Sequence, residues 1–301
     1  MATPNLRIFY LVGPTAVGKT SIAAEVAEAC HCEIISADAF QVYQGMDILT
    51  AKPSQEILQR VPHHLVGTIP LTKSFDAAQF QAAASAAAAQ IYARGKFPLV
   101  VGGTGLYVRA LTHGLAELPT ADPELRSELE PLSLEQLNRR YQELDPKGAM
   151  SIDSKNPRRL IRAIEVCLLT GKPFSSFRTE WRIPPENVAG VFLQRERREL
   201  YQRIDLRTEE MVKAGLFEEV KHLGQIGATA CQVIGLAEAR GFLAGDLTPE
   251  KAVDQIRQAT RHYAKRQITW FQRETHFNPM DAERGSLATE ISHMIRGFFR
   301  M

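Results

Sequence analysis

The sequence lacks several features that would assign it to a class of protein at once. No apolar run approaches the roughly 20 residues that a membrane-spanning helix needs, and a strand-like segment follows the first few residues without the hydrophobic stretch of a secretory signal. We therefore expect a cytoplasmic protein with no membrane segment. The cysteines Cys30, Cys32, Cys167 and Cys231 show no CxxC spacing, so we expect reduced, mostly buried thiols rather than disulfides or a zinc site.

Net charge is also small, but its distribution along the chain is uneven. The formal net charge is +2 over 301 residues, and 45% of the residues are hydrophobic, which is ordinary for a globular protein of one large or two modest domains. Residues 257–273 contain five Lys and Arg and no acid, and residues 155–162 contain four and no acid. These basic segments indicate a polyanionic partner more clearly than the net charge does.

The first third of the chain alternates short apolar runs with helical patterns. Strands are predicted at residues 7–12, 32–35 and 97–101, and helices at 20–30 and 75–94. Strands separated by helices indicate a parallel sheet that binds ligands at the carboxyl ends of its strands.

Strand patterns become rare from about Leu118 onward. Helical patterns that are interrupted by prolines cover residues 122–170 and 195–223, and a single strand is predicted between them at 187–193. The final third is predicted to be helical, with one helix starting at Thr248-Pro249-Glu250. The chain is therefore expected to leave the sheet, build a helical insertion, and return.

Residues 13–20, GPTAVGKT, fit the phosphate-binding pattern G-x-x-x-x-G-K-[ST], between a predicted strand and a predicted helix. In such a loop backbone N–H groups and the helix N-terminus surround a phosphate, while Lys19 adds charge and Thr20 can hold Mg²⁺. We predict an α/β fold with a P-loop NTPase-like parallel sheet core flanked by helices, a fold typical of ATP-binding and other nucleotide-binding proteins. The predicted phosphate ligands are Gly13, Pro14, Thr15, Ala16, Val17, Gly18, Lys19 and Thr20.

Two further segments are expected at the same edge of the sheet. The strand at 97–101 ends in Gly102-Gly103-Thr104-Gly105, where a motor or ATPase would normally carry an acid. Asp38 follows the second strand, and its carboxylate could take a proton from an acceptor nucleophile or cap the following turn, with neither role favoured by position alone. The Asn-Lys-x-Asp motif of a GTPase switch is absent.

Several other blocks of residues complete an ordered series. They include Ser36-Ala37-Asp38 with Gln41-Val42-Tyr43, Pro62-His63-His64-Leu65, VGGTGLY at 101–107, Arg162-Ala163-Ile164-Glu165-Val166 and AKRQITWF at 264–271. Together with the loop at 13–20, this series resembles the bacterial tRNA dimethylallyltransferases. The likeness runs in order from about residue 8 to 274. Any single block would be weak evidence for this family, whereas the whole ordered set is specific for it.

The resemblance implies a reaction. The loop would hold the diphosphate of dimethylallyl diphosphate, with Mg²⁺ at Thr20, and the prenyl group would pass to the exocyclic N6 of the adenine immediately 3′ of the anticodon, releasing diphosphate. Asp38 would take the proton of the adenine amine and Thr104 would lie near the reacting centre, so both are predicted to be catalytic. The target adenine must leave the stack of the anticodon loop to reach this site.

The resemblance also implies how the chain is divided. Residues 1–118 and 188–301 would form the catalytic core with basic C-terminal helices, and residues 119–187 a helical insertion domain that contacts tRNA. Arg257, Arg261 and Lys265 recur every four residues and would share a helix face toward RNA. Nothing in the sequence requires more than a monomer. Contacts to tRNA are predicted for Asp38, Ala39, Phe40, Gln41, Thr104, Arg126, Arg158, Arg159, Arg162, Gln232, Ile234, Gly235, Lys265, Arg266, Gln267 and Trp270.

The chain departs from the family pattern at two places. Ala39 stands where most relatives have serine, and the block that usually reads Gly-Tyr followed by a basic residue ends here in Gly235-Leu236-Ala237, so its last two positions differ. The first departure leaves open whether one hydrogen bond near the adenine or the loop is formed. The second leaves open any stacking or phosphate contact at Leu236 and Ala237.

Three alternative functions remain open from the sequence. An isopentenyltransferase acting on free adenine nucleotides would have a small acceptor and would not need the insertion or the basic C-terminal helix. A P-loop small-molecule kinase would use Asp38 to activate a hydroxyl group. A non-catalytic RNA-binding P-loop protein would leave Asp38 and Thr104 without a role.

Overall fold

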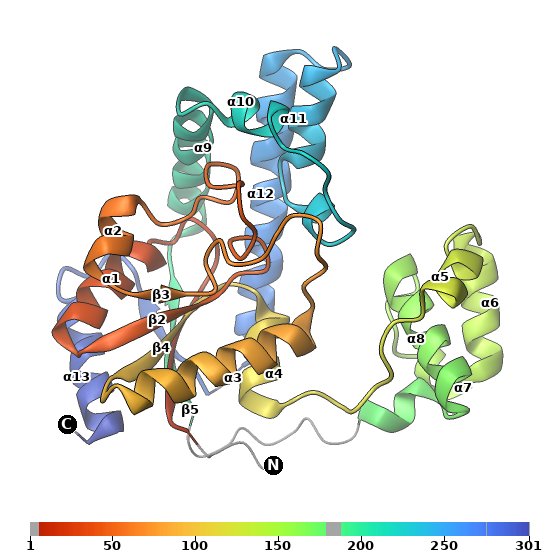
Figure 1. The fold of residues 1–301 in the computed structure, drawn as a ribbon, viewed down its shortest axis with the longest axis horizontal. Coiled ribbons are helices and arrows are strands. Elements are labelled where there is room, and N and C mark those ends of the chain that lie inside the picture. Colours follow the sequence, from red (N-terminus) through yellow and green to blue (C-terminus); the bar gives the residue numbers. More distant parts are fainter. Residues whose placement is uncertain (1–5, 179–187, 275, 301) are drawn as a thin grey trace. The chain divides into compact units, whose positions relative to one another are not determined.

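The structure is a computed structural model that describes residues 6–178, 188–274 and 276–300. The chain divides into two compact units (Figure 1): unit 1 consists of Met1–Thr112 and Pro184–Met301, and unit 2 of His113–Ile183. The end of the predicted insertion, 179–187, lies outside the described residues, and with it the first residue of the strand predicted at 187–193.

Unit 1 is built on a six-stranded sheet with the strand order β3-β2-β4-β1-β5-β6. Every pairing between neighbouring strands is parallel, which confirms the predicted α/β fold class. Four strands lie where the sequence predicts them, because each is an apolar run buried on both faces of the sheet. They are β1 (Ile8–Val12), β2 (Cys32–Ala37), β4 (Phe97–Gly102) and β5 (Val188–Gln194).

Two short edge strands were not foreseen. β3 (His63–His64) pairs with β2, and β6 (Asn278–Asp281) pairs with β5. The prediction of a wholly helical final third is therefore wrong at β6. This segment is short and contains Pro279, a residue that sheets accept at their edges, so its sequence carries no ordinary strand signal.

Helices cover both faces of the sheet. On one face α3 (Ala77–Ala93) and α4 (Gly105–His113) pack on alternate strand residues such as Tyr10 and Val100. On the other face α1 (Lys19–Ala29) and α13 (Leu287–Phe299) pack on the intervening residues. The alanines of α3 let this helix approach the sheet closely, and its first turn is closed by a capping box of Asp76 and Gln79. A short helix, α2 (Gln55–Arg60), precedes β3.

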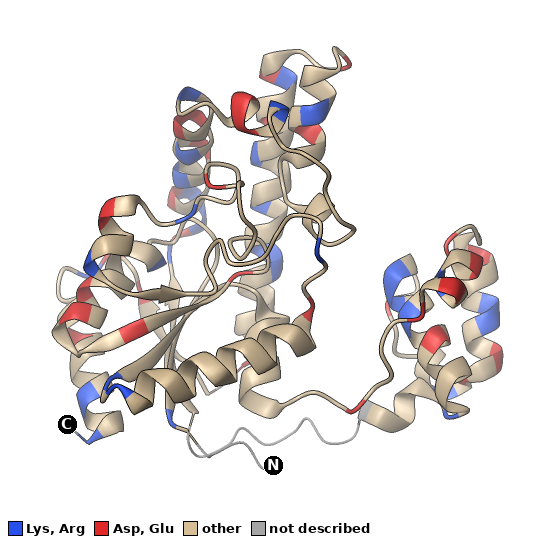
Figure 2. Cartoon of the chain, in the orientation of Figure 1, with Lys and Arg blue, Asp and Glu red and all other residues tan. Residues whose placement is uncertain are grey.

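The remaining helices of unit 1 form a group that includes α9 (Arg197–Lys213) and α12 (Pro249–Phe271), which run side by side in Figure 1. Lys and Arg alternate with Asp and Glu along α9 (Figure 2). Inward-facing residues of α12, among them Ala264 and Phe271, belong to the two clusters that cover the sheet. The shorter elements of this group are α10 (Leu216–Lys221), η2 (Ala230–Gln232) and α11 (Leu236–Leu243).

Helices are the regular secondary structure of unit 2 in its described part, which begins with an irregular segment at residues 114–122. Three prolines of this region begin new helices, because Pro123, Pro146 and Pro157 each follow a side-chain cap and occupy the first turn. Its core packs Leu129, Tyr141 and other apolar side chains between the helices. The elements are α5 (Pro123–Leu129), α6 (Leu134–Leu144), α7 (Pro146–Ala149), α8 (Pro157–Thr170) and η1 (Phe174–Arg178).

Two predictions, one about the cysteines and one about membrane-spanning helices, can be compared with the described residues. All four cysteines are free, and Cys30, Cys32 and Cys167 are buried whereas Cys231 is exposed, which confirms free and mostly buried thiols. Across the described ranges, no helix combines the length and the apolar character that crossing a membrane would require.

Candidate active site

The loop of residues 13–20 connects β1 to α1, which is the strand-loop-helix context that the motif requires. Gly18 adopts a left-handed conformation with φ of 109° immediately before α1, a conformation that favours glycine. No side chain caps the N-terminus of α1, so its first N–H groups remain available to an anion. Lys19 Nζ donates to the carbonyl oxygens of Gly13 and Pro14 at 2.9 and 2.8 Å.

The ammonium group of Lys19 lies where water has little access. Burial lowers its pKa to about 7, an effect that the negative charge of Asp38 opposes and the positive charge of Arg207 reinforces. Part of the Lys19 side chain still reaches the surface. These effects place the predicted phosphate ligand, the predicted proton acceptor and a third charged residue within one electrostatic site.

Asp38 follows β2 and caps the next turn, which was one of its two predicted roles. Its Oδ1 accepts hydrogen bonds from the backbone N–H groups of Phe40 at 2.9 Å and Gln41 at 3.2 Å. The carboxylate also lines a pocket that it shares with Thr15 of the phosphate loop. The same side chain can therefore hold the turn with one oxygen and still face a ligand in the pocket.

Thr104 is tied to the same turn. Its N–H donates to Ala37 O at 3.1 Å, and its Oγ1 accepts from the N–H of Ala39 at 3.0 Å. The neighbouring strands β2 and β4 are in register at Ala37 and Gly102, so the segments that follow them leave the sheet side by side. The predicted catalytic residues Asp38 and Thr104 consequently lie on adjacent connected turns.

The pocket that contains Thr15 and Asp38 is lined by both polar and apolar side chains. Its polar lining includes Arg207 of α9 and Tyr263 of α12. Burial raises the pKa of Tyr263 above its usual value, so this phenol stays neutral. The remaining lining residues come mainly from the loop before α2, α9, the segment before α11, and α12: Phe40, Leu49, Thr50, Ala51, Thr208, Met211, Val233, Ile234, Ile256 and Thr260.

The sequence analysis missed a set of arginines that hold the phosphate loop from α9 and the segment before it. Arg207 Nη2 donates to Thr15 Oγ1 at 2.7 Å, and Arg203 Nε donates to Ala16 O at 2.8 Å. Arg195 Nε donates to Val17 O at 3.4 Å. The four-residue spacing of Arg203 and Arg207 on one helix face was the available signal, but it does not show what that face contacts.

Gln267 and Trp270 of α12, two predicted tRNA contacts, pack against the glycine turn that follows β4. Gln267 Oε1 accepts from the N–H of Thr15 at 2.8 Å, and its Nε2 donates to Gly103 O at 2.9 Å. Gln267 is 4% exposed. A Cβ atom on Gly105 would lie 2.4 Å from the Trp270 indole, so this turn needs glycine to admit the helix.

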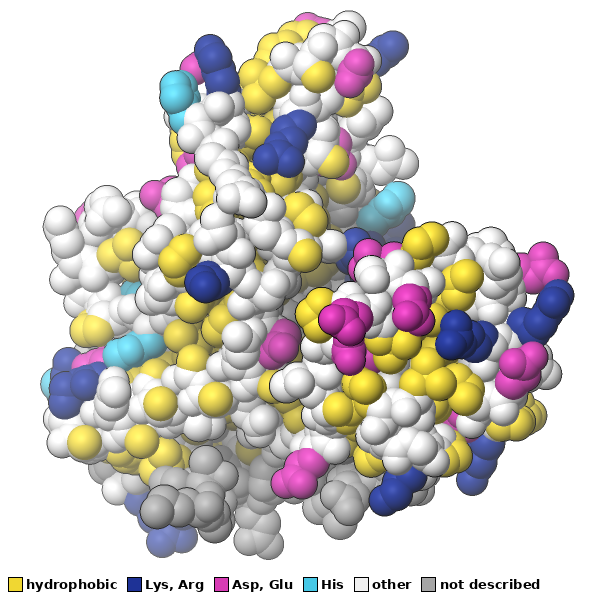
Figure 3. All heavy atoms as spheres, turned by 45° about the vertical axis from the view of Figure 1, so that its right-hand side comes forward, with side chains coloured by type: hydrophobic (Ala, Val, Ile, Leu, Met, Phe, Trp, Pro, Cys, Tyr) yellow, Lys and Arg dark blue, Asp and Glu magenta, His cyan; other side chains and the backbone are white. Residues whose placement is uncertain are grey.

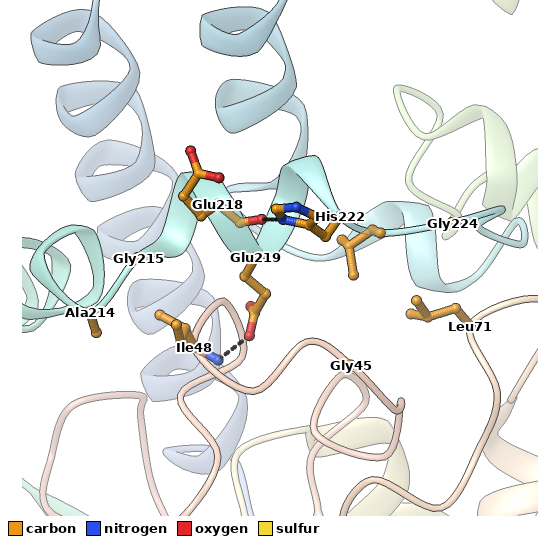
Figure 4. Close-up of a pocket in the computed structure, with 10 residues that line it drawn as sticks. Gly45, Ile48, Leu71, Ala214, Gly215, Glu218, Glu219, His222 and Gly224 are labelled. Carbon is orange, nitrogen blue, oxygen red and sulfur yellow. Dashed lines mark hydrogen bonds between the residues drawn. The ribbon is translucent and has the colours of Figure 1, made fainter.

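A carboxylate from α10 fixes the loop that forms another wall of the site. Glu219 accepts hydrogen bonds from three successive N–H groups, those of Asp47, Ile48 and Leu49, each at 2.8 Å. Figure 4 shows the bond from Ile48. Farther along this loop, Ala51 O accepts from Gln41 Nε2 at 3.0 Å. Through this loop Glu219 thus helps to position Gln41, which the sequence predicts to contact tRNA.

The basic face predicted on α12 is divided in the structure. Lys265 and Arg266 are exposed, and the Arg266 guanidinium lies 5.6 Å from the ring centre of Tyr263. Arg257 instead pairs with Glu209 at 2.7 Å, and Arg261 pairs with Asp205 at 2.5 Å. The interpretation of Arg257 and Arg261 as part of an RNA-facing row is therefore corrected: they bind acids of α9.

The predicted arginines of unit 2 also fall into two groups. Arg158 and Arg159 are exposed at the start of α8. Arg126 and Arg162 both bind the fully buried carboxylate of Glu165, at 2.8 and 2.5 Å. Lys and Arg side chains on the face shown in Figure 3 occur in small groups among acidic and apolar side chains, without a single continuous basic surface.

The three residues predicted around the start of α11 occupy different positions. Ile234 lines the pocket, whereas Gln232 is half-buried and its Nε2 donates to Ala228 O at 3.3 Å. Gly235 precedes α11 in a left-handed conformation with φ of 93°. Of the three, Ile234 is the residue that lines this pocket.

Comparison with known proteins places this architecture in a family. The family model described as "IPP transferase" matches residues 41–274. The chain is 44% identical to tRNA dimethylallyltransferase 1 of Citrifermentans bemidjiense over 97% of each chain, and 43% identical to tRNA dimethylallyltransferase 2 of Geotalea uraniireducens over 98% of each.

Solved structures give the same result at the level of the fold. The full-length tRNA isopentenylpyrophosphate transferase of Bacillus halodurans aligns with a TM-score of 0.73 and 37% identity, covering 98% of this chain and 97% of that one. A eukaryotic dimethylallyltransferase acting on tRNA aligns with a TM-score of 0.83 and 25% identity, covering 98% of this chain and 79% of that one. The chain belongs to the IPP transferase family.

Proposed function

We propose that this protein transfers a dimethylallyl group from dimethylallyl diphosphate to the exocyclic N6 of the adenine immediately 3′ of the anticodon in tRNA, and releases diphosphate. The observation that carries the proposal is that Thr15 of the phosphate loop, Asp38 and Arg207 line one pocket. An anion-binding loop and a carboxylate thus face the same small volume. The names of relatives with 43–44% identity over nearly the whole chain support the assignment.

The donor diphosphate would bind to N–H groups of residues 16–20, at the N-terminus of α1, with Lys19 and Arg207 beside it, since the N–H of Thr15 donates to Gln267. When the bond between the allylic carbon and oxygen breaks, negative charge accumulates on the departing diphosphate. Fixed positive groups stabilise that charge more strongly in the transition state than in the ground state, which accelerates the reaction. Arg207 is suited to this task because its planar guanidinium can donate two parallel hydrogen bonds to phosphate oxygens.

A magnesium ion is compatible with these residues. Within the described part of the chain no group of three or more His, Cys, Asp or Glu could hold a metal. Mg²⁺ commonly relies on substrate phosphates and water for most of its ligands, so the Thr20 hydroxyl with the donor's own oxygens would be a sufficient site. The ion would supply further neutralisation of the diphosphate charge.

The apolar side chains of the pocket suit the five-carbon part of the donor. Leu49, Met211 and Val233 line the same pocket as Asp38 and Arg207. An apolar wall next to an allylic carbon binds the prenyl chain and limits the access of water, which would otherwise compete with the amine as the acceptor. Apolar side chains at this place suit the prenyl group of dimethylallyl diphosphate better than the charged phosphoryl group that a kinase transfers.

On the acceptor side, Asp38 would accept a proton from the adenine N6 as the new carbon–nitrogen bond forms. The electron pair of the broken carbon–oxygen bond leaves with the diphosphate, so atoms and charge balance. The hydrogen bonds from Phe40 and Gln41 to Asp38 Oδ1 fix the carboxylate. Thr104, which accepts from Ala39, would hold the turn that receives the base.

Recognition of tRNA would rest on exposed basic residues. Lys265 and Arg266 on α12 and Arg158 and Arg159 on α8 are exposed, and their charges suit RNA phosphates, whose contacts position a bound nucleic acid. The adenine itself would be extruded into the pocket. We further propose that a single chain forms the complete site, because all of the pocket-lining residues belong to unit 1.

A direct assay tests the function. The protein and Mg²⁺ are incubated with labelled dimethylallyl diphosphate and either undermodified tRNA or AMP, and in a parallel reaction with labelled ATP. Label in tRNA at the adenine 3′ of the anticodon is the expected result. Label in AMP alone would identify an enzyme for free nucleotides, and phosphate transfer from ATP would identify a kinase; either outcome overturns the proposal.

The variant Asp38→Asn tests the role of the carboxylate. It keeps the acceptor oxygen for the Phe40 and Gln41 N–H groups but cannot take a proton, so we expect turnover to fall about 100-fold or more. The affinity for dimethylallyl diphosphate should stay within about threefold, since the phosphate loop is unchanged. A wild-type rate in single-turnover measurements would remove Asp38 from its proposed role.

A further inference from the structure

Gln267 joins the two loops on which the proposed reaction depends. Its carboxamide uses both of its polar atoms inside the protein: Oε1 accepts from the N–H of Thr15 in the phosphate loop, and Nε2 donates to Gly103 O in the turn that leads to Thr104. These residues are 252 and 164 positions away from Gln267 in the sequence. The side chain therefore bridges the proposed donor site and the proposed acceptor site.

The space around this bridge is tightly filled. A Cβ atom on Gly103 would lie 2.1 Å from Gln267 Nε2 and 2.8 Å from Gly13 O. The two loops also touch directly, because the N–H of Gly13 donates to Gly102 O at 3.3 Å. The glycine at 103 thus leaves room for the carboxamide to reach both loops, and neither loop can shift alone without losing a hydrogen bond.

Tyr263 extends the bridge toward the catalytic residues. It lies one helical turn before Gln267 on α12, lines the same pocket as Asp38, and has Thr104 and Gln267 close enough to lower the pKa of its hydroxyl. Thr104 in turn accepts the N–H of Ala39, the residue after Asp38. Tyr263 therefore lies between the Gln267 bridge and the turn that carries Asp38.

We propose that Gln267 is a positioning residue that holds the donor loop and the acceptor turn at a fixed separation, in place of the tRNA contact predicted from the sequence. This inference rests on the proposed function. Alkyl transfer requires the amine nitrogen to approach the allylic carbon along a defined line, and a displacement of about 1 Å can reduce the rate about 100-fold. The carboxamide suits the task because it accepts at one end and donates at the other.

The variant Gln267→Glu provides a test specific to the bridge. An ionised glutamate keeps the acceptor for Thr15 but has no proton for Gly103 O, and it places a negative charge against a carbonyl dipole. A protonated glutamate restores the donor, since its O–H can replace the amide N–H. Both burial and the facing carbonyl favour the neutral acid, so the variant should recover as the pH falls.

Turnover is measured at saturating donor and tRNA for the wild type, Gln267→Glu and Gln267→Leu, with Gln258→Glu as a matched control. Gln258 is exposed on the same helix, so this control adds the same charge away from the bridge. At pH about 8 we expect both Gln267 variants to lose about 30- to 100-fold in turnover. Their dissociation constants for donor and tRNA should change by less than about threefold, unlike those of a residue that contacts RNA.

The pH dependence is taken as the ratio of variant to wild-type turnover, which cancels any pH dependence that the two proteins share. We expect this ratio to rise about tenfold or more for Gln267→Glu between pH about 8 and pH about 6, and to stay flat for Gln267→Leu and Gln258→Glu. A flat ratio for Gln267→Glu overturns the inference, as does failure of this variant to fold over the whole range. Weakened tRNA binding with normal turnover would do the same.

The failure of this inference can be separated from a failure of the proposed function. If the wild type transfers no prenyl group from dimethylallyl diphosphate to tRNA, the proposed function is wrong. If the wild type is active and the Gln267→Glu ratio does not respond to pH, only the positioning role of Gln267 is wrong.

Discussion

The lowered pKa of Lys19 makes donor binding depend on pH in a direction that can be calculated. Burial lowers this pKa to about 7 in the free protein. A diphosphate placed beside the ammonium group favours its charged form, so the pKa must rise when the donor binds. Donor affinity is therefore greatest when Lys19 is already protonated, and it falls as the pH rises above about 7.

The size of the effect follows from the fraction of Lys19 that is protonated. With a pKa of about 7 in the free protein, and one that the bound diphosphate raises well above the working pH, the dissociation constant increases up to about tenfold per pH unit. Between pH 7 and 8.5 this amounts to about 16-fold. At pH 8 about 0.9 of a proton is taken up for each donor bound, because about nine-tenths of the free lysines are neutral there.

Calorimetry with dimethylallyl diphosphate and no tRNA measures both quantities. Titrations in two buffers with different ionisation enthalpies give the number of protons taken up, and a pH series gives the change in affinity. Lys19→Arg is the control: a guanidinium stays charged throughout this range, so the affinity should lose its dependence on Lys19 titration, whatever its absolute value.

Two outcomes would refute this reasoning. If the wild type takes up no protons at pH 8, Lys19 is already charged in the free protein and burial does not control its pKa. If Lys19→Arg shows the same proton uptake as the wild type, another group is responsible for it. In either case, the pH dependence of donor binding could not be assigned to the phosphate-loop lysine.

Three further predictions concern charged residues outside the phosphate loop. Arg207→Ala should weaken donor binding in calorimetry by about 2 kcal/mol, the contribution of a hydrogen bond to a charged group, whereas unchanged affinity would place Arg207 outside the diphosphate site. Lys265→Ala should weaken tRNA binding and reduce its salt slope by about one; an unaltered slope would mean that this lysine touches no phosphate. Glu165→Ala should destabilise unit 2 by about 3 kcal/mol in hydrogen exchange, since Arg126 and Arg162 would lose a buried partner, and unaltered protection of α5–α8 would contradict this.

The core of the fold could be predicted because its signals are local. β1, β2, β4 and β5 are apolar runs, and the phosphate loop is defined by the spacing of Gly13, Gly18 and Lys19. Parallel strands separated by helices then place their carboxyl ends at one edge. The sequence alone therefore predicts that Asp38 and Thr104 lie near the loop, although it leaves two roles open for Asp38.

The contribution of α9 could not be predicted in the same way. Arg207 reaches Thr15 across 192 positions of sequence, and its role depends on how the helix docks. Arg257 and Arg261 show the opposite error, because their regular spacing suggested an exposed basic row. The acids Asp205 and Glu209 repeat at the same four-residue interval on α9 and pair with them. Two complementary charged rows are as consistent with helix pairing as with RNA binding.

The glycine turn after β4 suggests how a P-loop scaffold suits alkyl transfer. In an ATPase an aspartate at this strand end helps to hold the magnesium ion. Here the carboxylate lies after the neighbouring strand: Ala37 and Gly102 are in register, and Asp38 follows Ala37. The space that an acid side chain would occupy after β4 is filled instead by α12, since a Cβ atom on Gly103 or Gly105 would collide with Gln267 or Trp270.

The position of the carboxylate after β2, with glycine instead of an acid after β4, has a chemical consequence. In the proposed reaction a carboxylate after β2, which lines the same pocket as Thr15 of the phosphate loop, would receive a proton from the base instead of binding the metal. The packing of α12 against the end of β4 would likewise remove volume that water could occupy near the donor, and Gln267 hydrogen-bonds to both loops there. An allylic electrophile has to be protected from water, so the loss of the acid and the close approach of the helix serve the same requirement.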